Sequence, residues 1–138
     1  MKPITLIAAL AFSVSFLSHA QAQVVIVSAK NPISKLTKEQ VAQLFMGQSH
    51  TFITGGQAEP LDLEDGSELR KAFYLKVLNK PPAQMKAFWS KLEFSGNARA
   101  PKALKSADML KLVSENPKFV GYVDAAAVTP AVKVVFTP

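Results

Sequence analysis

The sequence contains no cysteine, and it holds only two histidines, His19 and His50. The absence of cysteine excludes disulfides, thiol catalysis, thiolate metal sites and haem attachment through cysteine. Two histidines far apart in the sequence do not favour a histidine-rich metal site, and they leave few choices for a Ser-His-Asp arrangement. We therefore predict a protein that has no cofactor and is not an enzyme.

Long apolar runs are also lacking, except in one segment near the start. An apolar run from Ile4 to about Leu17 follows Lys2, and the small-x-small pattern of Ala20 and Ala22 comes after it. These are the three parts of a secretory signal peptide. The alternative is a membrane anchor, but the run is shorter than the roughly 20 residues of a spanning helix. We predict that residues 1–22 are a signal peptide, that the mature chain has no membrane span, and that it is periplasmic or secreted.

Acidic residues are fewer than basic ones, which gives the sequence a net charge of +6. Loss of Lys2 with the signal would lower this by one charge. A modest positive charge weakly favours anionic partners, although scattered lysines also simply keep a small domain in solution. No run of five or more basic residues occurs. Nucleic-acid binding is therefore not predicted.

The remaining residues, 23–138, alternate between strand and helix signals and are enough for one domain. Thr37 and Gln40 match the capping box of a helix start. We expect strands at 24–27, 58–63, 119–123 and 132–136, and helices between 37 and 47, 67 and 79, 82 and 95, and 106 and 116. Strands separated by helices indicate a single α/β domain with a mainly parallel, mixed sheet of about four strands covered by helices.

The turn Asp65-Gly66-Ser67 connects the second strand to the second helix. Free backbone N–H groups and the positive end of the helix dipole make such a point a potential anion site. The alternative is an ordinary turn in which Ser67 caps the helix. Glu68 in the first helical turn favours this alternative, because its carboxylate already satisfies the dipole and repels an anion.

Several motifs, taken in order, resemble one family. The chain is similar to the phosphate-binding subunits of ABC transporters, and more closely to short, signal-bearing proteins described as phosphate ABC transporter substrate-binding proteins. The resemblance spans residues 24–136. It rests on Asn31-Pro32, the segment Leu36 to Gly47, the turn Asp65-Gly66-Ser67, Phe88-Trp89, and the segment Asn116 to Val123.

The resemblance implies a periplasmic-binding-protein-like α/β lobe. Full-length relatives hold an oxyanion between two such lobes, whereas this chain has room for one. It also implies a ligand-binding set of Asp65, Gly66 and Ser67, to which we add Arg70, one helical turn further on.

The family pattern at this turn is Arg-Ser-Asp-Gly-Ser-Gly-Thr, and three of its contact positions hold Leu63, Glu68 and Leu69 here. Two hypotheses stay open. The chain is a solute-binding-type module that binds phosphate or a similar small oxyanion weakly. Alternatively, it is a ligand-free interaction domain that docks on an envelope protein or on a second copy of itself.

Other residues capable of chemistry have simpler interpretations. His50 lies in a polar segment and is typical of a solvated surface residue. Trp89 belongs to the apolar face of the third helix, where a core role is favoured over ligand stacking. Arg99, Lys102 and Lys105 form a basic loop, for which solvation is favoured over contact with an anion.

Overall fold

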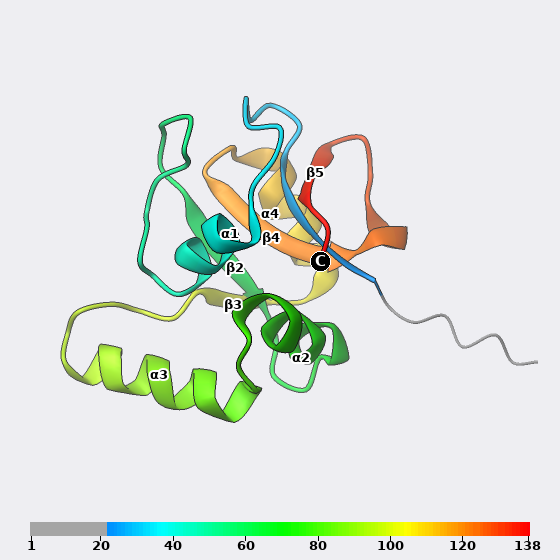
Figure 1. Cartoon of the computed structure of the whole chain (residues 1–138). Coiled ribbons are helices and arrows are strands. Elements are labelled where there is room, and N and C mark those ends of the chain that lie inside the picture. Colours follow the sequence, from blue (N-terminus) through cyan, green and yellow to red (C-terminus); the bar gives the residue numbers. More distant parts are fainter. Residues whose placement is uncertain (1–21) are drawn as a thin grey trace, which may run out of the picture.

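The computed structural model describes residues 22–138 (Figure 1). The predicted signal peptide therefore lies almost entirely outside the described residues, and it stays a prediction. Strand β1 (Gln23–Ser28) starts at the first residue of the predicted mature chain. Among residues 22–138 no helix has the length and hydropathy needed to cross a bilayer.

Five strands form one mixed sheet in the order β3-β2-β4-β1-β5. The other four are β2 (Glu59–Leu63), β3 (Lys102–Leu104), β4 (Phe119–Asp124) and β5 (Val132–Phe136). β2 runs parallel to both β3 and β4, while β1 runs antiparallel to β4 and β5. The predicted α/β class and mixed sheet are confirmed, with five strands in place of about four.

The additional strand, β3, lies within the segment that the sequence suggested to be a basic loop. It is three residues long and pairs with β2 at the edge of the sheet. Lys102 and Ala103 are exposed. A short edge strand needs no apolar alternation, so hydrophobic patterning gives no signal for it.

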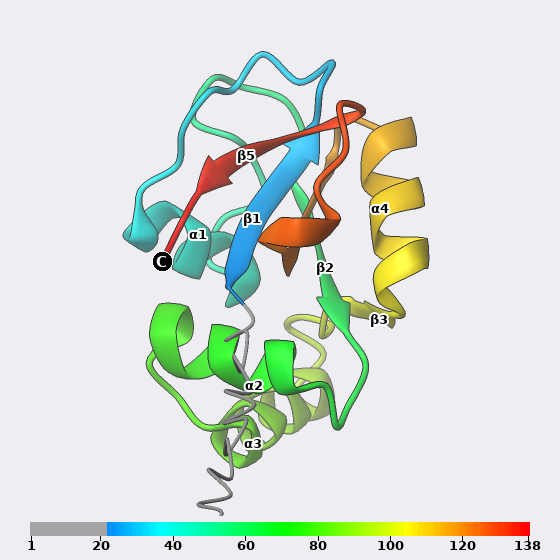
Figure 2. The ribbon, with the colours of Figure 1, turned by 90° about the vertical axis from the view of Figure 1, so that its right-hand side faces the viewer.

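Helices cover both faces of this sheet. Figure 2 shows α1 (Lys38–Phe45) and α4 (Ser106–Glu115) on opposite sides, with α2 (Glu68–Phe73) and α3 (Pro82–Phe94) beyond the end of β2. α2 continues directly into a π-helical turn, Tyr74–Leu78. The predicted capping box of α1 is present, since Thr37 and Gln40 bond each other's backbone N–H groups. α4, in contrast, begins directly at Ser106, and its N-cap residue Lys105 makes no side-chain cap hydrogen bond.

An aromatic cluster fills the core between the sheet and the helices on the α1 side. The ring of Tyr122, on β4, stacks on Phe73, with centroids 3.9 Å apart and planes 6° from parallel. Phe45 meets both rings edge-on. Tyr122 and Phe73 are each 0% exposed. This packing holds α1 and β4 against α2, the helix that begins at the predicted site.

Candidate functional site

The predicted turn has the local geometry that its sequence indicates. β2 ends at Leu63, Gly66 adopts a φ of +83°, and α2 begins at Glu68. A positive φ is easily reached only by a residue without a Cβ, which explains glycine at this position. The Ser67 hydroxyl accepts from the Arg70 N–H at 3.2 Å, so Ser67 is the N-cap. The first N–H groups of a helix have no intrahelical acceptor, and those of Glu68 and Leu69 face this end of α2.

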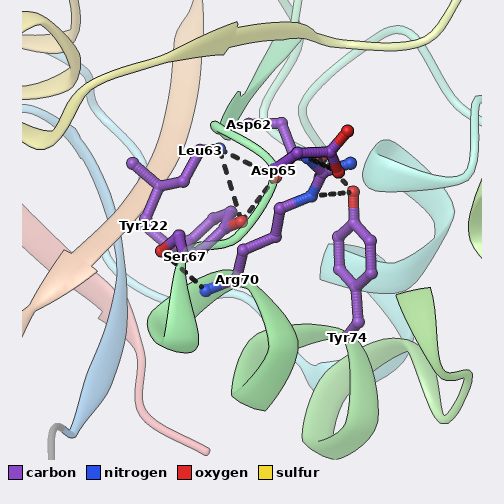
Figure 3. A network of polar contacts seen from close by, with 7 residues as sticks. All are labelled: Asp62, Leu63, Asp65, Ser67, Arg70, Tyr74 and Tyr122. Carbon is purple, nitrogen blue, oxygen red and sulfur yellow. Dashed lines mark hydrogen bonds and ion pairs between the residues drawn. The ribbon is translucent and has the colours of Figure 1, made fainter.

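Arg70 folds back from α2 onto the turn rather than extending into solvent (Figure 3). Its terminal nitrogen lies 2.8 Å from a carboxylate oxygen of Asp65, and its Nε lies 3.7 Å from Asp62. Nε also donates to the Tyr74 hydroxyl at 3.0 Å. Partial burial lowers the pKa of Arg70, but Asp62, Tyr74 and Asp65 together raise it above its ordinary value. Arg70 is therefore a cation whose charge two carboxylates already share.

Asp62 is the buried centre of this polar network, and it was not among the site residues predicted from the sequence. It is 4% exposed and accepts from the hydroxyls of Tyr74 and Tyr122, as well as from the Leu63 N–H at 2.8 Å. Burial, followed by the charge of Asp62, raises the pKa of both tyrosines. Both phenols thus stay protonated and donate, and they satisfy a carboxylate that would otherwise be costly to bury.

A shallow cavity of about 230 Å³ opens beside the turn. All four predicted ligand residues line it, together with Glu68, Lys71 and Pro82. The structure therefore places Asp65, Gly66, Ser67 and Arg70 on one cavity. Its lining carries two acidic and two basic side chains, and one of the bases is Arg70.

The family contact positions that differ in this sequence do not all face the cavity. Leu63 and Leu69 are 1% and 6% exposed, and both side chains belong to the core. Glu68 is exposed beside Ser67. The groups available to an anion are therefore the Ser67 hydroxyl hydrogen, the backbone N–H groups of Gly66, Glu68 and Leu69, and the outer part of the Arg70 guanidinium; the Ser67 N–H already donates to the Glu64 carbonyl at 3.2 Å.

Comparisons with known proteins bear on the fold. No protein-family model matches the sequence, and no curated protein matches it at a significant level. Solved structures do match. An ABC-type phosphate transport receptor from Vibrio cholerae has a TM-score of 0.66 at 18% identity, over 83% of this chain and 46% of its own.

Two further solved structures agree. A phosphate ABC transporter substrate-binding protein with bound phosphate, from Clostridium perfringens, has a TM-score of 0.64 at 24% identity, and PstS from Borrelia burgdorferi has 0.62 at 15%. Each is matched over 83% of this chain and over 44% and 46% of its own length, respectively. This chain thus spans less than half of each protein. The likeness confirms the resemblance and the fold that the sequence predicted, and it fits a single lobe.

Proposed function

We propose that this chain is an extracytoplasmic solute-binding-type module that holds a small oxyanion, with phosphate as the leading candidate, at the turn before α2. The observation that carries the proposal is the strand–turn–helix geometry at Gly66 and Ser67, with N–H groups at the helix start. The fold shared with proteins of phosphate transport, one of them holding phosphate, supports the choice of ligand. Their roles in transport also support a function in binding rather than catalysis. The extracytoplasmic location rests on the signal-like residues 1–22.

We expect such binding to be weak. A single lobe buries one side of a ligand, and Asp65 and Glu68 repel an anion from the cavity edge. Arg70 attracts an anion less strongly than an unpaired arginine would, because it already forms ion pairs with Asp62 and Asp65. We expect a dissociation constant on the order of millimolar, since only a few hydrogen bonds offset the cost of association.

Calorimetric titration of the purified protein with phosphate tests the proposal, with sulfate beside it and at low and moderate salt. Ser67→Asp keeps an N-cap acceptor but places a negative charge at the site, so it should abolish the heat. Ser67→Thr keeps both the cap and the hydroxyl, and should retain it. No saturable heat with millimolar phosphate, or equal heat in the Ser67→Asp variant, would contradict the proposal.

A second candidate is a ligand-free interaction domain, which docks on an envelope protein or on another copy of this chain. The observations that favour it are the buried Leu63 where the family pattern has arginine, and the pairing of Arg70 with two carboxylates. Sedimentation velocity over a range of concentrations, with and without phosphate, tests self-association. A concentration-dependent dimer without any phosphate heat would support this candidate, and a strict monomer would rule out the second copy as partner.

A further inference from the structure

A larger cavity lies at the other end of β2 from the turn. Its volume is about 550 Å³, within the range of small-molecule sites. Glu59 and Pro60, the first residues of β2, line it, whereas the turn follows Leu63, the last residue. The cavity is thus separate from the candidate oxyanion site.

The cavity brings together residues that the sequence suggested to be unrelated. Trp89 comes from α3, His50 from the segment after α1, Arg99 from the segment leading into β3, and Lys102 from the first position of β3. Their convergence depends on the pairing of β3 with β2, because that pairing carries the basic segment to the sheet edge beside α3. No sequence pattern predicted this edge strand.

An apolar wall is formed around Trp89, which is 7% exposed. Leu44 and Pro60 also line the cavity. Gly47 has a φ of +70°, and a Cβ there would lie 3.1 Å from Cη2 of Trp89. The missing side chain lets the indole pack close against the chain after α1, so the wall is fixed by packing rather than by a flexible loop.

The charge lining this cavity is mainly positive. Arg99 and Lys102 are exposed, and among residues 22–138 neither has a carboxylate within ion-pair distance. The acidic residue of the lining, Glu59, lies 3.4 Å from the Lys118 ammonium, which offsets its charge. Arg99 and Lys102 therefore lie beside an apolar wall, and within the described residues neither forms an ion pair with a carboxylate.

We propose that this cavity binds a small organic carboxylate with an aromatic body. The ring contacts Trp89, Leu44 and Pro60, and the carboxylate faces Arg99 and Lys102. Planar guanidinium groups suit carboxylate oxygens, and an aromatic ring gains from contact with an indole. Inorganic phosphate has no apolar part to place against the wall, so this site is distinct in ligand as well as in position. The proposal does not depend on oxyanion binding at Ser67.

Trp89 is the single tryptophan of the sequence, so intrinsic fluorescence reports this cavity directly. The probe is benzoate, with benzyl alcohol as an uncharged ligand of similar size that keeps the ring, and acetate as the carboxylate without the ring. We expect a saturable change with benzoate and binding at least about fivefold weaker for benzyl alcohol, because two partly exposed charge contacts are lost. Acetate should give no saturable change.

Matched variants separate the site from general electrostatics. Arg99→Gln with Lys102→Gln removes two cations from the lining, whereas Lys91→Gln with Lys111→Gln removes two exposed cations elsewhere. We expect about fivefold weaker benzoate binding in the first pair and no change in the second. Equal affinity in both pairs, or benzyl alcohol binding as tightly as benzoate, would overturn the proposal. Ser67→Asp should leave benzoate binding unchanged, which keeps this test independent of the phosphate test.

Discussion

Replacement of Tyr122 by phenylalanine tests the buried network at the end of β2. The substitution removes one hydroxyl and keeps the ring that stacks on Phe73 at 3.9 Å. The lost hydroxyl donates to Asp62 and accepts from the Leu63 N–H at 3.4 Å. Asp62 keeps two other donors, the Tyr74 hydroxyl and the Leu63 N–H. The change therefore removes one charge-assisted hydrogen bond and one long contact from the Leu63 N–H, which keeps Asp62 as its closer acceptor at 2.8 Å.

A hydrogen bond to a charged group contributes about 1.5–3 kcal/mol, so we expect Tyr122→Phe to lower the free energy of unfolding by about 2 kcal/mol. In urea denaturation followed by circular dichroism, this corresponds to a midpoint lower by about 1 M at an unchanged m value. Ser95→Ala is the matched control. It also removes one hydroxyl bond, to the Leu92 carbonyl, but at an exposed position. We expect it to cost under about 0.5 kcal/mol.

Equal costs for Tyr122→Phe and Ser95→Ala would refute the reasoning, because the buried carboxylate would then not depend on the phenol. A second arm uses Asp62→Asn, which weakens the acceptor. In that background the cost of Tyr122→Phe should fall to about 1 kcal/mol, the value of a neutral hydrogen bond. An unchanged cost would mean that the contribution of the hydroxyl does not depend on the charge of Asp62.

Three other predictions concern the fold. The sequence has only two tyrosines, and both have a raised pKa in the folded state, so unfolded chains release these protons above about pH 10 while folded chains keep them. The free energy of unfolding should fall by about 1.4 kcal/mol per pH unit for each tyrosine above that pH. Tyrosinate absorbance should appear only on unfolding. Absorbance that titrates near pH 10 in the folded protein would contradict this prediction. Thr37→Ala removes the cap of α1 and should cost about 1 kcal/mol in urea denaturation, whereas no loss would show that the capping box contributes little. Gly121→Ala would place a Cβ 2.3 Å from the sulfur of Met109, so we expect a loss of about 2 kcal/mol by thermal denaturation, and an unchanged melting temperature would mean that α4 shifts freely.

Local signals explain which parts of the fold the sequence predicts. The capping box at Thr37, the buried run of β1 and the turn at Gly66 depend on residues within a few positions of one another. Such patterns determine element type and approximate bounds without tertiary information. The pairing of β3 with β2 and the order of the strands have no such local sequence pattern, because both are set by contacts between residues that are distant in the sequence.

The same distinction applies to the candidate sites. The turn was predicted because Gly66 and Ser67 are adjacent, whereas Asp62 bonds to Tyr122, which is 60 positions away. Alternation of Leu61, Asp62 and Leu63 suggests an outward polar residue, yet helices cover both faces of the sheet here and Asp62 is buried. The cavity at Trp89 was missed for a similar reason, since its lining comes from four separate segments.

The most direct test of the central proposal is a ¹H–¹⁵N correlation spectrum of the purified protein during titration with phosphate. The account predicts saturable shifts of the backbone amides of Gly66, Glu68 and Leu69, with the indole N–H of Trp89 unmoved. Amide shifts spread over exposed lysines, or no shift at the turn with millimolar phosphate, would contradict an oxyanion site at the start of α2.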